Sequence, residues 1–87
     1  MNCIWQAGTS DSTESKNVGD AKSKEECLQK YLDSEIDAAG LTWSGGKSGH
    51  YCQADYNPKG LDASFNCTAL EYECSYCIFK KGEDGYS

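Results

Sequence analysis

The side chains with the most evident chemistry in this chain are its six cysteines and its single histidine. Cys74-x-x-Cys77 has the spacing of half a zinc site, and His50-x-Cys52 supplies a less usual second half. Zinc would leave the other three cysteines without a role. An even number of scattered cysteines in 87 residues is more typical of a scaffold with three disulfides. We therefore expect disulfides and an oxidising compartment, with a small zinc-stabilised domain as an alternative.

Patterns that resemble catalytic or cofactor motifs fail on their own spacing. Gly45-Gly46-Lys47-Ser48 lacks the first glycine of a phosphate-binding loop, because Leu41 occupies that position. Asp55-x-Asn57-x-Lys59 begins like a calcium loop, but Asn66 stands where a bidentate glutamate is needed. No serine has an identifiable base and orienting partner, and a chain of this size rarely forms a cleft with two placed carboxylates. We expect no enzyme activity, no metal and no cofactor.

Aromatic side chains are the remaining group that can serve recognition. Tyrosine offers an amphipathic contact surface and is enriched at interfaces. Tyr51 and Tyr56 lie close in sequence to polar groups that can hydrogen-bond sugar hydroxyls, although a partly buried place in a thin core is the competing interpretation for each. The candidate binding residues are His50, Tyr51, Asp55, Tyr56 and Asn57. Asn66-Cys67-Thr68 is in addition a formal N-glycosylation sequon.

Charge and hydropathy exclude several classes of partner. The net charge is −6, with 8 basic residues, all lysine, against 14 acidic ones, which disfavours nucleic acid and anionic membranes. No apolar run approaches the roughly 20 residues of a membrane span, so we expect no membrane insertion. The first residues show no signal-peptide pattern, and we expect a mature fragment to which Met1 was added. The oligomeric state stays open.

Local patterns predict one helix and several short strands within a single domain, residues 1–87. Ser23 can cap a helix over about 24–34, with Glu26 placed to reach back to the cap as in a capping box. Cys27, Leu28, Tyr31 and Leu32 would share the apolar face of this helix. The other expected elements are an opening strand over 3–7, a polar loop over 8–22, a hairpin from 38–44 and 50–54 around a glycine-rich turn, a turn over 55–60, a short strand over 65–68, a closing strand over 71–79 and a frayed tail over 80–87. The predicted fold class is α+β: one helix packed on a mainly antiparallel sheet.

This order of elements resembles the PAN/apple domain family. The matching segments are Ser23-Lys24-Glu25-Glu26-Cys27-Leu28 at the helix start, Ala39-Gly40-Leu41-Thr42-Trp43-Ser44 as the aromatic strand, and Tyr51-Cys52 in the hairpin. The resemblance covers mainly residues 21–55. The second helix cysteine of three-bridge members is replaced by Tyr31, and its usual partner falls near Ala38 or Ala39.

The resemblance also implies a disulfide pairing, which the residues alone leave open among 15 possibilities. It implies Cys27–Cys52, joining the helix to the sheet, and Cys3 joined to Cys77. Cys67–Cys74 would then be a bridge outside the common family pattern. An exchange that gives Cys67–Cys77 and Cys3–Cys74 is a serious alternative.

The function that these expectations favour is extracellular, non-catalytic recognition of a carbohydrate or a protein. The hairpin and the loop after Cys52 would form the binding surface. The alternative from a different class is a freestanding secreted signalling ligand, similar to a pheromone, a toxin or a protease inhibitor. The partner in either case would be an extracellular protein or glycan.

Overall fold

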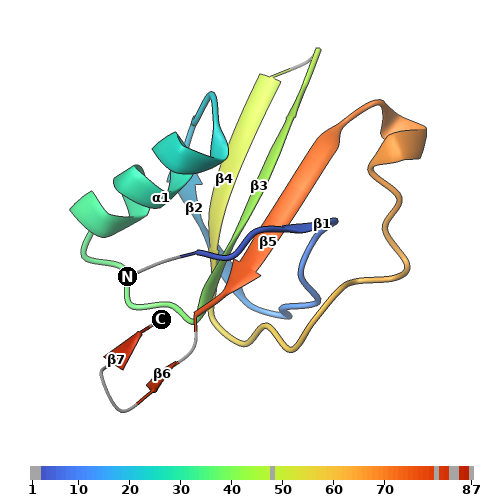
Figure 1. The fold of residues 1–87 in the computed structure, drawn as a ribbon. Coiled ribbons are helices and arrows are strands. Elements are labelled where there is room, and N and C mark those ends of the chain that lie inside the picture. The colour runs from blue at the N-terminus through green and yellow to red at the C-terminus, as the bar shows by residue number, and fades with distance from the viewer. Residues whose placement is uncertain (1–2, 48, 80, 83–84, 87) are drawn as a thin grey trace.

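The computed structural model describes residues 3–47, 49–79, 81–82 and 85–86. Strands β1 to β5 form one antiparallel sheet in the order β1-β5-β3-β4-β2, and β6 and β7 form a separate two-stranded hairpin (Figure 1). The α-helix α1 packs against one face of the sheet, over β2, β3 and β4. The small α+β domain expected from the sequence is thus confirmed. The elements are β1 (Gln6–Ala7), β2 (Ser15–Gly19), α1 (Lys24–Asp33), β3 (Gly40–Gly46), β4 (Gly49–Asp55), the short 3-10 helix η1 (Thr68–Leu70), β5 (Glu73–Ile78), β6 (Lys81–Gly82) and β7 (Gly85–Tyr86).

Helix α1 begins where the capping signal predicts. The side-chain oxygen of Ser23 accepts a hydrogen bond from the backbone N–H of Glu26 at 3.1 Å. The Glu26 carboxylate does not close a capping box; it lies 3.8 Å from the Lys30 ammonium one turn on. At the other end, the Ser34 N–H and hydroxyl both donate to the carbonyl of Tyr31.

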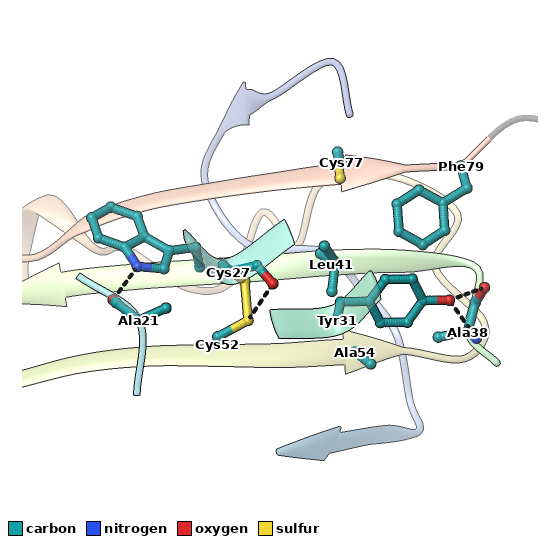
Figure 2. Close-up of a cluster of buried hydrophobic side chains, with 10 residues drawn as sticks. Ala21, Cys27, Tyr31, Ala38, Leu41, Cys52, Ala54, Cys77 and Phe79 are labelled. Atoms are coloured by element: carbon teal, nitrogen blue, oxygen red, sulfur yellow. Dashed lines mark hydrogen bonds between the residues drawn. A yellow bond between two sulfur atoms is a disulfide. The ribbon is translucent and has the colours of Figure 1, made fainter. Parts of the chain in front are cut away.

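The core lies between α1 and the sheet. Cys27 and Tyr31 are the buried residues of the helix, Leu28 is half-buried, and Leu32 is 45% exposed, so the buried face is narrower than expected. The Tyr31 ring packs on Phe79 with the ring centroids 5.3 Å apart, while its hydroxyl accepts a hydrogen bond from the Ala38 N–H (Figure 2). Leu41, Trp43, Cys52, Ala54 and Cys77 supply most of the sheet's contribution.

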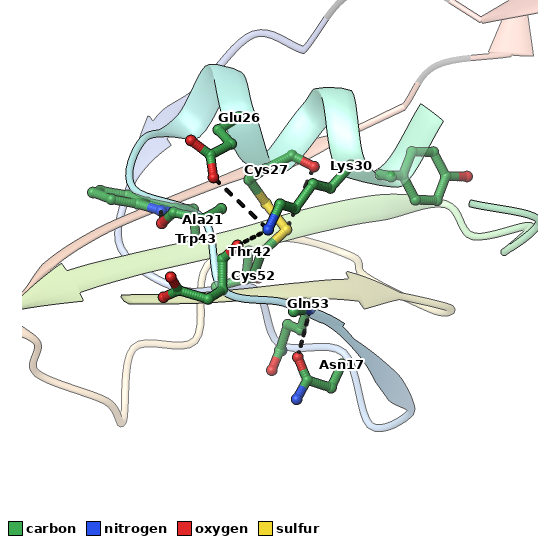
Figure 3. Close-up of a disulfide and its surroundings, with 12 residues drawn as sticks. Asn17, Ala21, Glu26, Cys27, Lys30, Thr42, Trp43, Cys52 and Gln53 are labelled. Atoms are coloured by element: carbon green, nitrogen blue, oxygen red, sulfur yellow. Dashed lines mark hydrogen bonds and ion pairs between the residues drawn. A yellow bond between two sulfur atoms is a disulfide. The ribbon is translucent and has the colours of Figure 1, made fainter. Parts of the chain in front are cut away.

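Three disulfides join these elements: Cys3–Cys77, Cys27–Cys52 and Cys67–Cys74. This is the pairing that the family resemblance implied, and the exchanged pairing is not the one present. Figure 3 shows Cys27 of α1 bridged to Cys52 of β4 beneath the helix. Since all six cysteines are bridged, none is available as a zinc ligand. Among the residues that the structure describes, no helix has the length and apolar character needed to cross a bilayer.

Several expectations about loops and strands were wrong. The expected polar loop over 8–22 contains β2, which pairs with β4 from Ser15 opposite Asp55 to Gly19 opposite Cys52. β2 is an edge strand, and its residues Ser15, Lys16 and Asn17 are exposed. The opening strand is limited to Gln6–Ala7, and 65–68 is irregular chain that enters η1 instead of forming a strand. In the expected frayed tail, Lys81–Gly82 pairs with Gly85–Tyr86, while 80, 83–84 and 87 lie outside the described residues.

Candidate functional site: a groove on the face opposite the helix

Strand alternation divides the side chains of β3 and β4 between the two faces of the sheet. Trp43, Cys52 and Ala54 belong to the core beneath α1. The residues between them therefore point to the opposite face, which we call the groove face. Figure 3 shows Gln53 on the side of the sheet away from the helix. The cross-strand pairs Thr42–Gln53 and Ser44–Tyr51 place four polar or aromatic side chains side by side on the groove face.

A groove of about 340 Å³ lies on this face. Its floor comes from β3, β4 and β5, and its two sides come from the loop before β2 and from the segment 61–72. Phe65, Tyr51 and Tyr72 provide aromatic surface, and most of the remaining lining is hydroxyl or amide. The lining residues are Thr9, Ser10, Ser12, Thr42, Ser44, Tyr51, Gln53, Asp62, Phe65, Tyr72 and Cys74.

The third disulfide attaches one wall of the groove to its floor. Cys74 lies on β5 opposite Ser44 and therefore on the groove face, whereas Cys77 and Cys52 point toward the helix. Cys67 belongs to the segment 61–72, so the Cys67–Cys74 bridge holds this segment against the sheet. The Tyr72 N–H also donates to the Cys67 carbonyl at 2.9 Å. The Cys67–Cys74 bridge therefore links the segment that contains Asp62, Phe65 and Tyr72 to the groove floor.

The other side of the groove is held by backbone and side-chain hydrogen bonds between 8–14 and 57–62. The Asp62 N–H donates to the Thr9 carbonyl at 2.8 Å, and Ser10 forms an isolated β-bridge with Leu61. The Asp11 carboxylate accepts hydrogen bonds from the backbone N–H groups of Lys59 and Gly60 at 2.7 and 3.0 Å. These two amides, Lys59 first, lower the pKa of Asp11 from its usual value of 3.8.

The carboxylate of Asp55, which is 0% exposed, adjoins three of the residues that line the groove. Its Oδ2 accepts hydrogen bonds from the hydroxyls of Ser10 at 2.8 Å and Thr42 at 2.6 Å. Its Oδ1 accepts from the side-chain amide of Gln53 at 2.9 Å. Three neutral donors therefore satisfy this buried acid, as the cost of burying a charged group requires.

The structure does not bring the five expected binding residues together. Asp55 was expected at a binding surface and is instead fully buried, because it sits at the end of β4 under the loop that contains Ser10. Asn57 is exposed, but its side-chain oxygen accepts from the Ser12 hydroxyl and from the backbone N–H groups of Thr13 and Glu14. Asn57 thus organises a turn.

The two tyrosines and the histidine are also separated. Tyr51 lines the groove and is 42% exposed. Tyr56 is 38% exposed, but it lies five positions further along an extended chain, which is roughly 16 Å, and its N–H donates to the Glu14 carbonyl. His50, next to Tyr51 on the same strand, belongs to the face that α1 covers, because neighbouring strand residues alternate in direction.

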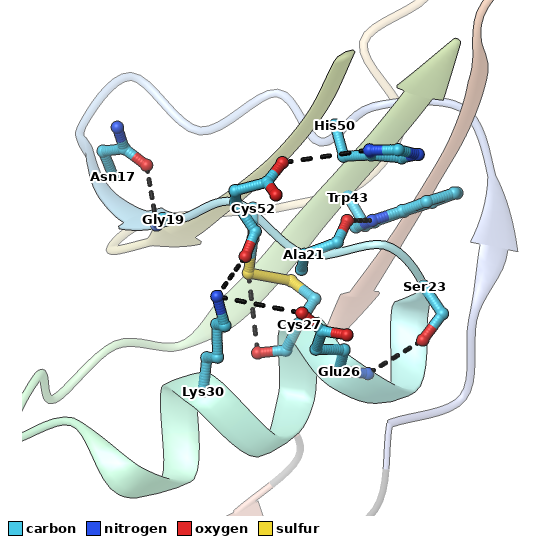
Figure 4. A network of polar contacts seen from close by, with 11 residues as sticks. Asn17, Gly19, Ala21, Ser23, Glu26, Cys27, Lys30, Trp43, His50 and Cys52 are labelled. Carbon is cyan, nitrogen blue, oxygen red and sulfur yellow. Dashed lines mark hydrogen bonds and ion pairs between the residues drawn. A yellow bond between two sulfur atoms is a disulfide. The ribbon is translucent and has the colours of Figure 1, made fainter.

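His50 has structural neighbours on the helix side. Its ring stacks on that of Trp43 with an interplanar angle of 23° and centroids 6.4 Å apart, and its Nδ1 is 3.8 Å from the Asp20 carboxylate (Figure 4). The Trp43 indole N–H donates to the Ala21 carbonyl at 2.7 Å. Gly45 leaves room for this pair, since an added Cβ would meet the Trp43 ring at 2.8 Å. Part of the His50 side chain also borders a second hollow with Tyr51 and Tyr72.

The sequon residue Asn66 is exposed and borders a separate hollow of about 590 Å³ between β5 and the segment 61–72. Its side-chain oxygen accepts a hydrogen bond from the Ala69 N–H at 3.2 Å, at the start of η1. Glycosylation of Asn66 stays a prediction.

The groove floor was not predicted from the sequence. Thr42, Ser44 and Gln53 are ordinary polar residues within predicted strands, so their residue types alone do not indicate a site. The signal was present in the alternation of the hairpin, since both strands place polar residues at every second position on the side of Tyr51. The wall formed by Asp62 and Phe65 had no comparable signal.

Comparisons with known proteins found no relative: no family model matches the chain, and no match was found among curated proteins or solved structures.

Proposed function

We propose that this protein is an extracellular, non-catalytic recognition module that binds a glycan or a protein through the groove opposite α1. The observation that carries the proposal is the groove itself, in which an exposed tyrosine lies beside hydroxyl and amide groups on a rigid sheet. Binding sites commonly combine an aromatic surface with a few placed polar groups on a preformed scaffold. The proposed binding surface therefore retains Tyr51 from the five expected residues. Other groove residues take the place of His50, Asp55, Tyr56 and Asn57.

A relation to PAN/apple domains is part of this proposal. It is supported by the order of elements, with one helix bridged to the middle of a hairpin through Cys27–Cys52 and the chain ends tied through Cys3–Cys77. Members of that family serve adhesion and recognition. The replacement of the second helix cysteine by Tyr31 is accommodated, because Tyr31 packs on Phe79 and binds the Ala38 backbone in the same region.

The extracellular and non-catalytic parts of the proposal have separate support. Three disulfides in 87 residues favour an oxidising compartment. The ring of the single histidine stacks on Trp43, and its Nδ1 lies 3.8 Å from the Asp20 carboxylate on the helix side. All cysteines are bridged, so none offers a nucleophilic thiolate.

A matched pair of tyrosine variants tests the site. Tyr51→Ala removes aromatic surface from the groove, while Tyr56→Ala removes a similarly exposed tyrosine outside it. Both purified variants and the unchanged protein are applied to arrays of defined glycans and defined extracellular proteins. We expect Tyr51→Ala to weaken binding at least tenfold and Tyr56→Ala to leave it within twofold. Equal losses in the two variants, or no ligand on either array, would contradict the proposal.

A freestanding secreted ligand is the second candidate, and one observation favours it. The segment 61–70 carries Leu61, Phe65 and Leu70, which are 53%, 46% and 55% exposed. Exposed apolar side chains mark a protein partner where they form one contiguous patch, so this candidate requires the three to bind the partner together. If this candidate is right, the Leu70→Ala variant loses binding on the protein array while Tyr51→Ala retains it.

A further inference from the structure

The directions of the hydrogen bonds between Asp55 and the groove-lining residues determine what the groove floor can offer a ligand. A hydroxyl has one hydrogen to donate, and Ser10 and Thr42 both direct theirs to the Asp55 carboxylate. The two hydroxyl oxygens also lie 3.2 Å apart, and Ser10 and Thr42 are only 8% and 4% exposed. The small exposed part of each hydroxyl therefore presents lone pairs, not hydrogens, to the groove. The side-chain NH₂ of Gln53 also donates to Asp55. The side-chain oxygen of Gln53, which is an acceptor, is not bonded to Asp55.

The electrostatic character of the groove agrees with this bias toward acceptors. Asp62 is the one charged side chain among the described residues that line the groove, and it is acidic. Its Oδ1 accepts from the Ser64 N–H and hydroxyl. The chain as a whole carries a net charge of −6. A carboxylated or sulfated ligand would meet lone pairs below it and a negative charge beside it.

We propose that the groove binds a sugar without negative charge, whose hydroxyls donate to Ser10, Thr42 and Gln53 and whose ring packs on Tyr51. This inference rests on the proposed function and names the ligand class of the same groove. Sugar hydroxyls are donors as well as acceptors, so they match a floor of acceptors, and the less polar face of a sugar ring suits an aromatic side chain.

Asp55 is then a positioning residue. It is buried and touches no ligand, but it fixes the hydrogen direction of three groups at the floor. Asp55→Asn keeps the shape and replaces one acceptor oxygen with an NH₂ donor. A hydroxyl that faces this NH₂ must turn to accept, which releases its hydrogen toward the groove. A change in ligand preference therefore distinguishes this role from a merely structural one.

The first experiment is an NMR titration of the oxidised protein with two sets of probes. The neutral set contains the methyl glycosides of glucose, galactose, mannose and N-acetylglucosamine, and the acidic set contains glucuronic acid and N-acetylneuraminic acid. We expect at least one neutral probe to give saturable shifts at Thr42, Tyr51 and Gln53, and the acidic probes to bind at least tenfold more weakly. Saturation by an acidic probe with equal affinity, or by no neutral probe, overturns the inference.

The second experiment measures the same probes with variants of the floor. Asp55→Asn is expected to reduce the ratio of neutral to acidic affinity by about tenfold, the order of magnitude for reversing a hydrogen bond to a charged group. Thr42→Val should weaken neutral binding about fivefold, while Thr42→Ser, which retains the hydroxyl, stays within twofold. If Asp55→Asn fails to form its disulfides, Gln53→Met replaces it and should weaken neutral binding by the same fivefold. An unchanged ratio in Asp55→Asn overturns the role of Asp55, and unchanged neutral binding in Thr42→Val or Gln53→Met overturns the floor as the sugar-binding surface.

The two levels of the proposal fail differently. If Tyr51→Ala loses binding to a protein ligand and no neutral sugar binds the unchanged protein, the groove remains a recognition site and the sugar inference is overturned. If no ligand of any class depends on Tyr51, the proposed function and the inference are both overturned.

Discussion

Asp11 illustrates how one exposed side chain joins segments that are distant in sequence. Its carboxylate accepts hydrogen bonds from the backbone of Lys59 and Gly60, and its own N–H donates to the Gly60 carbonyl at 3.0 Å. Asn57 does the same for Ser12, Thr13 and Glu14. Both side chains join the segments whose neighbouring residues Ser10, Ser12 and Asp62 line the groove, so they shape it without lining it.

The contribution of the Asp11 carboxylate to folding stability increases with pH. Its pKa in the folded protein is lowered from 3.8, so its stabilising effect is complete above that pH and is lost as the pH falls through the lower, folded value. We expect the amide ¹⁵N shifts of Lys59 and Gly60 to titrate with a midpoint below 3.8. Asp11→Asn should abolish this titration, and Asp33→Asn, at the end of α1, should leave it unchanged. A midpoint above the usual value would contradict this account.

Gly46 sets the position of the Tyr72 ring at the end of the hairpin. A Cβ at Gly46 would lie within 2.6 Å of Tyr72 Cδ1 and Cε1, so Gly46→Ala must displace the ring or the strand. We expect a loss of about 1–3 kcal/mol in the free energy of unfolding, as for other overpacked sites, and a shift of the Tyr72 ring resonances. Gly60→Ala is the matched control, because an added Cβ there meets nothing within 4 Å. Equal effects of the two substitutions would refute the packing argument.

At the scale of elements, α1 depends on its cap and on its bridge. A helix of ten residues is marginal in water, and Cys27 and Tyr31 are its only fully enclosed residues within the described chain. The Ser23 cap is therefore a substantial part of its local stability. The bridge to Cys52 holds the helix at one point, while the cap fixes where the helix begins.

Removal of the cap is predicted to cost about 1 kcal/mol in the free energy of unfolding, measured as the shift of the urea midpoint of Ser23→Ala. Ser23→Asp retains an acceptor for the Glu26 N–H and should be within about 0.3 kcal/mol of the unchanged protein. Because Glu26 pairs with Lys30 and not with the cap, Glu26→Gln should change stability by less than Ser23→Ala. A larger cost for Glu26→Gln would indicate a capping box after all.

At the scale of the whole molecule, the three bridges divide between the two faces of the sheet. Cys27–Cys52 and Cys3–Cys77 lie on the helix side and close spans of 25 and 74 residues. Cys67–Cys74 closes a span of 7 residues and serves the groove wall. Bridges that close longer loops restrict the unfolded chain more. The two long-span bridges therefore stabilise the core on the helix side, and the short-span bridge holds the segment 61–72 against the sheet.

This division predicts different results for two double variants. From loop closure alone, Cys67→Ala/Cys74→Ala should lower the free energy of unfolding by about 2.5 kcal/mol and Cys27→Ala/Cys52→Ala by about 3.5 kcal/mol. We expect the first variant to keep the circular dichroism of α1 and lose groove binding, and the second to lose helical signal. Urea denaturation and the sugar titration measure both effects. Retained binding without Cys67–Cys74 would show that this bridge does not hold the wall.

Much of this architecture was determined by local sequence. Ser23 before Glu26 predicted the start of α1, and two β-prone runs around glycines predicted the hairpin of β3 and β4. The even cysteine count indicated three bridges. These signals depend on hydrogen bonds and side-chain periods within a few residues, so they can be read from a short stretch of chain.

Only the tertiary structure decided which polar residues meet. β2 is a strand because Ser15 pairs with Asp55, which lies forty positions away in the sequence. Nothing in the polar sequence of β2 itself predicts this pairing. Asp55 is buried because Ser10, Thr42 and Gln53 can satisfy its carboxylate, whereas the sequence placed it in an exposed turn. The groove depends on the same distant pairings and on Cys67–Cys74. Burial of a polar group is decided by partners that the fold assembles, and such partners leave no mark on the local sequence.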